Sequence, residues 1–233
     1  MICVKISGFQ KTSLVDYPDK IVSTIFTSGC NFRCGFCHNP ELVTGNNLPL
    51  ISEQEIINHL KQHKNFLDGI CITGGEPTLH QDLPEFIKKI KQVGFLVKLD
   101  TNGTNPEMLE SLIKNNLIDY IAMDIKAPIE KYKEIVNVEV STGKIQKSIE
   151  FIQNSGIDYE FRTTLLPDIL NKKDMLKIAE WLKGSKKYYI QQFRSGKTLD
   201  PKFQDANPYT LKELKEFKEL MSPFFEVCEV RES

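Results

Sequence analysis

The sequence predicts an α/β fold with a mainly parallel sheet and helices on its outer side. Short runs rich in β-branched and aromatic residues alternate with amphipathic segments six times along the chain, and parallel strands need such crossover connections. Polar residues recur where these runs end. Six units rather than eight suggest an incomplete barrel, although a closed (β/α)8 barrel or a doubly wound open sheet gives the same pattern. Of the 233 residues, 40% are hydrophobic, which suffices for one core, so we expect a single domain over residues 1–233.

Apolar runs of strand character give the positions of the strands. The six strands that alternate with helices are expected at residues 21–26, 69–73, 95–99, 120–123, 159–163 and 188–193. One further strand is expected at each end of the chain, over residues 1–6 and 224–230. Since the chain opens on a strand and no apolar run reaches the length of a membrane span, we expect a cytoplasmic protein without a membrane segment.

Capping residues and helical spacing give the positions of the helices. Ser52 with Glu55, and Thr210 with Glu213, match the capping-box pattern. Asp82 is expected to cap the helix after the second of the six strands, and an Asn-Pro pair opens the helix after the third. Apolar residues at helical spacing mark the remaining helices. The core of the domain is expected over about residues 19–195, and a last helix and strand over residues 208–230.

Three cysteines follow the first of the six strands within eight residues, at Cys30, Cys34 and Cys37. Glycines in the same loop would let the thiolates converge on one soft metal centre. An odd number of cysteines fits a disulfide poorly. Zinc needs four ligands, and the obvious fourth candidate, His38, is adjacent to Cys37 and hard to aim at the same ion. An iron–sulfur cubane has four irons, so three cysteines would leave one iron open. We therefore expect a [4Fe-4S] cluster, with zinc as the alternative.

The charge balance and the other cysteines limit the partners. The formal net charge is −1, which lacks the basic excess that broad nucleic-acid binding needs. Cys3, Cys71 and Cys228 stand alone in apolar or mixed runs, where a free cysteine behaves as a small buried hydrophobe. No second C-x2-C pair offers ligands for another cluster. Electrons are therefore expected from another protein.

Polar groups are expected to gather at one end of the sheet, because active sites of α/β barrels form at the carboxyl ends of the strands. The residues that the strands carry to this end are Gly74, Gly75, Glu76, Asp100, Asn102, Asp124, Lys126 and Arg162. The glycine pair would let the backbone approach a ligand closely, with free carbonyl groups and the Glu76 carboxylate available for an ammonium group. Lys126 suits a point-charge contact with a carboxylate. The charged residues could also form an ion-pair cluster that closes a barrel.

The spacing C-x3-C-x2-C, with Phe36 before the last cysteine, resembles the signature of the radical S-adenosylmethionine (SAM) superfamily. Residues 8–18, 37–42, 123–128 and 191–194 resemble the glycyl-radical-enzyme activating proteins more closely, in particular the activating component of anaerobic ribonucleoside-triphosphate reductase. The resemblance covers nearly the whole chain. It implies the incomplete (β/α)6 TIM-like barrel of the radical SAM type.

The resemblance also implies roles for individual residues. Cys30, Cys34 and Cys37 would hold the [4Fe-4S] cluster and so serve catalysis. The residues implied in SAM binding are Phe36 and His38 beside adenine, Gly74, Gly75 and Glu76 at the amino group, Lys126 at the carboxylate, and Asp100, Asn102, Asp124 and Arg162 nearby. Asp100 and Asp124 would help to hold a monovalent cation beside the SAM carboxylate.

The reaction implied by the resemblance is reductive cleavage of SAM at the cluster to a 5′-deoxyadenosyl radical, which generates a glycyl radical on a partner enzyme, anaerobic ribonucleotide reductase. A flavodoxin- or ferredoxin-type protein would supply the electron. Residues 127–143 and 194–209 are expected to face the partner. The alternatives are activation of another glycyl-radical enzyme of the pyruvate formate-lyase type, a radical SAM enzyme that acts on a small molecule, and a binding or electron-transfer module without turnover.

Overall fold

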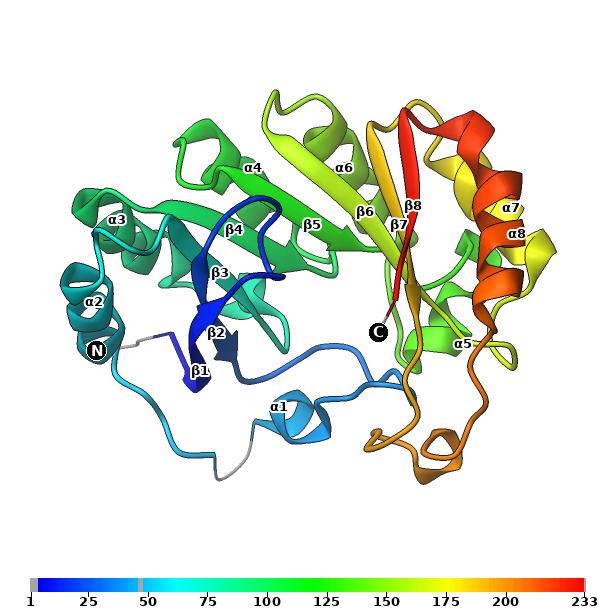
Figure 1. The fold of residues 1–233 in the computed structure, drawn as a ribbon, viewed down its shortest axis with the longest axis horizontal. Coiled ribbons are helices and arrows are strands. Elements are labelled where there is room, and N and C mark those ends of the chain that lie inside the picture. Colours follow the sequence, from blue (N-terminus) through cyan, green and yellow to red (C-terminus); the bar gives the residue numbers. More distant parts are fainter. Residues whose placement is uncertain (1–3, 46–47, 233) are drawn as a thin grey trace.

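One mixed sheet organises the computed structural model, which describes residues 4–45 and 48–232. Its strands follow chain order from edge to edge: β1 (Ile6–Ser13), β2 (Val22–Thr27), β3 (Gly69–Gly74), β4 (Leu96–Thr101), β5 (Tyr120–Asp124), β6 (Asp158–Leu165), β7 (Lys187–Gln192) and β8 (Val227–Arg231). β1 runs antiparallel to β2, and every later pair is parallel. Within the described residues β1 and β8 do not pair, so the sheet is an open arc (Figure 1). The predicted incomplete α/β barrel is confirmed, with one extra strand at each edge.

The first strand lies later in the chain than predicted. We expected it over residues 1–6, but β1 begins at Ile6, and residues 1–3 lie outside the described part of the chain. The reason is the pairing register, in which Ile6 lies opposite Thr27, the last residue of β2. Because β2 ends at Thr27, the residues before Ile6 have no residue of β2 opposite them, whereas residues after Ile6 do.

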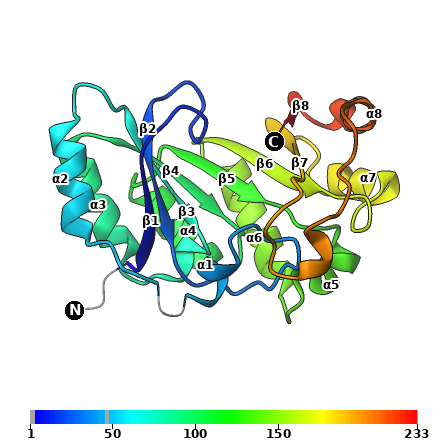
Figure 2. The ribbon, with the colours of Figure 1, turned by 60° about the horizontal axis from the view of Figure 1, so that its bottom comes forward.

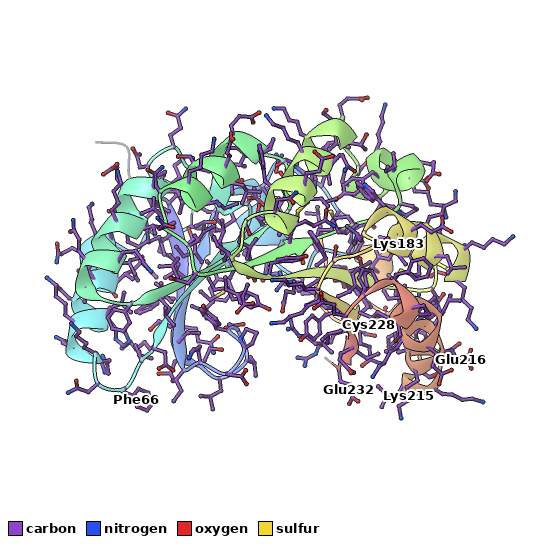
Figure 3. The ribbon with its side chains drawn as sticks, turned by 90° about the horizontal axis from the view of Figure 1, so that it is seen from above. Phe66, Lys183, Lys215, Glu216, Cys228 and Glu232 are labelled. Atoms are coloured by element: carbon purple, nitrogen blue, oxygen red, sulfur yellow. The ribbon has the colours of Figure 1, made fainter. Side chains whose placement is uncertain are left out.

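Eight α-helices connect the strands of the described chain. They are α1 (Pro40–Thr44), α2 (Glu53–Gln62), α3 (Leu83–Val93), α4 (Pro106–Lys114), α5 (Tyr132–Val136), α6 (Thr142–Gln153), α7 (Lys172–Trp181) and α8 (Leu211–Met221). The longer helices lie along the convex side of the arc, as Figure 2 shows from a second direction. In the view from above, the arc is open on the side where Cys228 and Glu232 lie (Figure 3). No helix in the described ranges is long and apolar enough to cross a membrane.

The predicted capping residues explain where three helices begin, but not a fourth. The side chain of Ser52 accepts the N–H of Glu55 at 3.1 Å, and the side chain of Asn105 accepts the N–H of Met108 at 3.2 Å. Thr210 and Glu213 form the reciprocal capping box. Asp82 occupies the N-cap position of α3 without a side-chain cap bond. Its ψ angle of 2° departs from the extended conformation that lets an N-cap side chain reach back to the helix. One of its carboxylate oxygens is buried without a hydrogen-bond partner in the described structure.

The two faces of the sheet are covered by different kinds of buried side chains. On the convex face, helix residues such as Leu60 and Phe86 pack on the sheet in one large apolar core, where each fully buried side chain contributes about 1.5–3 kcal/mol. On the concave face a small apolar cluster of Tyr17, Val22 and Cys71 with Tyr120 fills the space near the start of the strands. The hairpin between β1 and β2 supplies Tyr17, whose ring lies 5.4 Å from that of Tyr120. Polar side chains are therefore left for the carboxyl ends of the strands.

Candidate active site

The loop that follows β2 carries three thiols into one cavity. Cys34 is buried, and Cys30 and Cys37 are half-buried. The loop is fastened to α1, because the N–H of Gly29 donates to the carbonyl of Leu42 at 2.7 Å. Burial raises the pKa of Cys30 to about 11 and that of Cys34 to about 12. A metal centre would favour the thiolate form that these buried groups otherwise resist.

A segment from the other end of the chain covers this loop. We call residues 193–206 the cover segment. The N–H groups of Leu199 and Asp200 donate to the carbonyls of Cys37 and Gly35, at 3.0 and 2.8 Å. A Cβ on Gly35 would lie 2.6 Å from the ring of Phe203, so any larger residue at this position would displace that ring. The first part of the predicted partner-facing segment, residues 194–209, packs on the cysteine loop, close to α1 and α5 in Figure 2. Its contact with a partner stays a prediction.

The two residues predicted beside adenine lie under the cover segment. The ring of Phe36 is buried and meets the edge of Phe203, with 6.4 Å between the ring centres. His38 stacks on Phe193 at 4.9 Å. Its Nδ1 lies 3.1 Å from the carbonyl of Lys197. The imidazole is thereby oriented, and its other edge is left for a ligand.

A cavity of about 230 Å³ brings the predicted residues together. It is lined by Cys30, Phe32, Cys34, Phe36, Cys37, His38, Asn39, Val43, Thr73, Gly74, Gly75, Glu76, Asp100, Thr101, Asn102, Asp124, Lys126 and Thr164. Every predicted site residue except Arg162 is among them. Among the described residues, no three His, Cys, Asp or Glu side chains are close enough to cage a single metal ion. The three thiols line this cavity together with most of the residues predicted to bind SAM.

The glycine pair after β3 joins the strand to the cysteine loop. Gly74 has φ +120°, and a Cβ on it would lie 2.3 Å from the backbone nitrogen of Thr27. A Cβ on Gly75 would lie 2.1 Å from the carbonyl oxygen of Gly29. The N–H of Gly75 donates to Thr27, and the N–H of Glu76 donates to Gly29, both at 2.8 Å. Glycine is required here because two backbones touch.

The carboxylate of Glu76 is engaged by the protein itself. It is fully buried and accepts hydrogen bonds from both the N–H and the hydroxyl of Thr78, from the hydroxyl of Thr101 and from the N–H of Asn102. Burial raises its pKa, and these donors oppose that rise. Three of these bonds go to Oε1 and one goes to Oε2, so Oε2 keeps an acceptor position for the predicted contact with an ammonium group. In the present structure Glu76 and Asn102 tie the ends of β3 and β4 together.

Opposite the cysteines, charges alternate across three strands. Arg162 donates through Nε to Asp124 at 2.8 Å and lies 3.2 Å from Asp100 through NH1. Lys126 lies 3.1 Å from the other oxygen of Asp124. Lys98 donates to the other oxygen of Asp100. We call these five residues the charged floor. Arg162 therefore lies behind the aspartates and acts on the cavity through them.

The charged floor contains three cations and two carboxylates, and of its cations Lys126 lines the cavity. Despite burial, the Arg162 guanidinium and the lysines hold the pKa values of Asp100 and Asp124 below the usual range. The pKa of Lys126 is raised, because Asp124 outweighs the effect of burial. Two carboxylates thus face the cations of Lys98, Arg162 and Lys126, although Arg162 also lies 3.8 Å from Glu160. An anionic group in the cavity would be attracted by Lys126, which lines it.

The residues of the floor do not fit a monovalent cation. Such an ion takes oxygen ligands, and here each oxygen of Asp100 and Asp124 already accepts from a charged side chain of the protein. A further cation between them would meet the positive charges of Lys98, Arg162 and Lys126.

Sequence reasoning missed Lys98 and the cover segment. Lys98 lies two residues before Asp100 on β4, so both side chains point to the same face of the sheet. That spacing was the available signal for Lys98. No local signal marks the cover segment. On the far side of the Asp100–Arg162 pair a second cavity of about 230 Å³ opens, which Lys98 and Arg231 help to line.

Comparison with known proteins agrees with this geometry. Residues 24–182 match the family model described as Radical SAM superfamily. The chain is 37% identical over 231 residues to a protein of Methanocaldococcus jannaschii that carries the provisional name glycyl-radical enzyme activating enzyme, covering 97% of this chain and 95% of that protein. It is 27% identical to the pyruvate formate-lyase-activating enzyme of Clostridium pasteurianum, over 79% of this chain and 78% of that enzyme.

A solved structure shows the same fold. SuiB of Streptococcus suis, bound to its precursor peptide SuiA, superposes with a TM-score of 0.68 at 14% identity. The match covers 88% of this chain, which spans about half of SuiB (48%).

Proposed function

Because the chain belongs to the radical SAM superfamily, we propose that it is an activating enzyme that uses SAM to generate a glycyl radical on a partner enzyme. One observation carries the proposal: three thiols line one side of a cavity whose floor presents Lys126 and whose rim carries Gly74 and Gly75. The similarity to a glycyl-radical enzyme activating enzyme along nearly the full length of both chains supports the choice within the superfamily.

The donor set fits a [4Fe-4S] cluster held by Cys30, Cys34 and Cys37. These thiols line one cavity, and the three-cysteine loop contains no fourth cysteine. When bound, the cluster supplies one electron and an open iron for SAM. The cover segment and α1 close the loop from outside and so limit the access of water and oxygen.

The residues around the cavity would orient SAM in the following way. Lys126 would pair with its carboxylate, because this lysine is the cation of the floor that lines the cavity. The backbone beside Gly74 and Gly75 would receive its amino group, and Phe36 and His38 would flank its adenine. Asp100, Asp124 and Arg162 would hold Lys126 in place rather than touch the reacting atoms.

The partner that we propose is anaerobic ribonucleotide reductase, with a flavodoxin- or ferredoxin-type protein as electron donor. Residues 8–18 and 191–194, which resemble the activating component of that reductase, support this choice. Cys71 and Cys228 are buried on different strands, so within the described chain they do not supply a second cluster for electron entry. The similarity to a pyruvate formate-lyase-activating enzyme makes a glycyl-radical enzyme of the pyruvate formate-lyase type the second candidate partner.

Two measurements test the proposal. Protein reconstituted anaerobically with iron and sulfide, reduced with dithionite and mixed with SAM is expected to form methionine and 5′-deoxyadenosine. Electron paramagnetic resonance of the same mixture with anaerobic ribonucleotide reductase is expected to show a glycyl doublet, which a parallel mixture with pyruvate formate-lyase lacks. Absence of 5′-deoxyadenosine would contradict the radical SAM assignment. A doublet with pyruvate formate-lyase alone would overturn only the partner.

A further inference from the structure

A buried lysine lies behind the aspartates of the charged floor. The side chain of Lys98 is 2% exposed. Its ammonium donates to Asp100 and lies 3.8 Å from the Sγ of Cys71. This ion pair places a positive charge in the interior of the arc, beside the candidate SAM site.

Lys98 supplies part of the positive charge that balances the Asp100 carboxylate. Without Lys98, Arg162 would be the remaining cation of the described chain that contacts Asp100, and Arg162 also contacts Asp124 and Glu160. Glu160 has its own partner in Arg231, which binds it through two nitrogens at 2.5 and 2.6 Å. The charge of Lys98 is thus needed to balance Asp100, and a buried carboxylate that loses its partner is strongly unfavourable.

We propose that the ammonium of Lys98 takes the place of a monovalent cation in this protein, so that its binding of SAM does not depend on K⁺ or Na⁺. The inference rests on the proposed function, because it concerns the cavity that would hold SAM. It also replaces the cation that the family resemblance implied between Asp100 and Asp124, whose oxygens are all engaged by side chains of the protein.

The two kinds of cation carry the same charge but differ in the free energy that their binding costs. An alkali cation and an ammonium group both carry one positive charge and both bind carboxylate oxygens. The ammonium of Lys98 is tethered to β4, so it need not be taken from solution when SAM binds. Lys98 acts on SAM through Asp100 and Arg162, and we therefore regard it as a positioning residue. Removing its charge would leave the SAM carboxylate facing two aspartates with one cation fewer.

The experiment compares SAM affinity in three salts. Holoenzyme with its cluster is dialysed anaerobically against labelled SAM in KCl, NaCl or tetramethylammonium chloride, each at about 0.15 M ionic strength. Tetramethylammonium is too bulky to enter a site made for K⁺. The wild type is expected to bind SAM with the same Kd, within about twofold, in all three salts.

Substitution of Lys98 should make the Kd for SAM depend on the cation in solution. Lys98→Ala removes the charge and leaves space for an ion. It is expected to weaken SAM binding about tenfold or more in tetramethylammonium chloride. K⁺ or methylammonium should restore much of that loss. The matched control is Lys88→Ala on the exposed face of α3, where the lysine pairs only with Glu85, and its Kd should not change with the salt.

Each outcome decides the matter. A wild type that loses affinity when K⁺ and Na⁺ are withdrawn overturns the inference, and this arm remains decisive if Lys98→Ala does not fold. A Lys98→Ala protein that binds as the wild type does, or whose loss no cation repairs, also overturns it, since Lys98 would then have only a structural part. A wild type that binds no SAM in any salt contradicts the proposed function together with this inference.

Discussion

The two sides of the candidate site are built in different ways. The cysteine side comes from one loop of eight residues, Cys30 to Cys37, whose chemistry is local in the sequence. The charged floor takes Lys98 and Asp100 from β4, Asp124 and Lys126 from the end of β5 and just beyond it, and Arg162 from β6. Its ion pairs join residues up to 62 positions apart. A local motif survives small shifts of its surroundings, whereas the floor exists only when the strands pair in the right register.

The register shows why the floor is sensitive. Asp124 on β5 lies opposite Arg162 on β6, and Thr101 on β4 lies opposite Met123 on β5. A slip of one residue would turn Arg162 to the other face of the sheet and away from both aspartates. Single substitutions that keep the register are expected to act differently on the two sides. Loss of a cysteine is expected to abolish the activity, whereas loss of one charge of the floor is expected to weaken SAM binding.

The largest effect is expected from Cys34→Ala, which removes a predicted cluster ligand. Iron content should fall, and formation of 5′-deoxyadenosine should decrease by more than about 100-fold. This decrease exceeds the loss of about 10- to 100-fold that is typical when a residue that only supports a metal ligand is removed. The iron assay and product chromatography measure both. Cys228→Ala is the control, because this cysteine is buried on β8 away from the cavity. Full activity of Cys34→Ala would refute the ligand assignment.

Lys126→Met should weaken the SAM binding that depends on the charged floor without affecting the iron binding that depends on the cysteines. It removes the positive charge that lines the cavity while leaving the thiols in place, so the iron content should stay as in the wild type. The Kd for SAM should rise about 10- to 100-fold, the value of a hydrogen bond between charged groups. Lys133→Met alters a lysine that is 67% exposed and should not affect binding. Unchanged affinity in Lys126→Met would remove Lys126 from the SAM site.

A smaller effect, on stability, is expected from Glu76→Gln. An amide at this position would turn a donor towards one of the groups that now donate to the carboxylate, which are Thr78, Thr101 and the N–H of Asn102. The free energy of unfolding of the apoprotein should fall by about 1–3 kcal/mol. Urea unfolding followed by circular dichroism measures it, with Glu107→Gln on the surface as control. A variant as stable as the wild type would show that the carboxylate is not the tie between β3 and β4.

The smallest effect is expected from Phe203→Ala in the cover segment. The change removes the ring that lies against Phe36 and Gly35 but no ligand and no charge. Turnover should stay near the wild-type rate, while an iron chelator should bleach the cluster several-fold faster, as expected when a packed surface opens locally. Phe66→Ala at an exposed site is the control. Equal bleaching rates would mean that the cover segment does not restrict access.

The sequence was sufficient for the periodic and the local features. The alternation of strands and helices predicted the α/β sheet, and the spacing of Cys30, Cys34 and Cys37 predicted a shared cavity. Two features escaped prediction. Lys98 and Asp100 are only two positions apart, but the burial of Lys98 depends on the packing of the whole sheet. The packing of Phe203 on the cysteine loop joins residues that lie far apart in the sequence, since Phe203 comes 166 residues after Cys37. Nothing local in the sequence reveals that four donors of the protein surround the Glu76 carboxylate.

The distance along the chain between the cysteine loop and its cover segment has a consequence for biosynthesis. A ribosome that adds about 5–20 residues per second needs roughly ten to thirty seconds to proceed from Cys37 to Phe203. For much of that interval the cysteine loop exists without the residues that pack on it, so the loop is more accessible in the growing chain than in the finished protein.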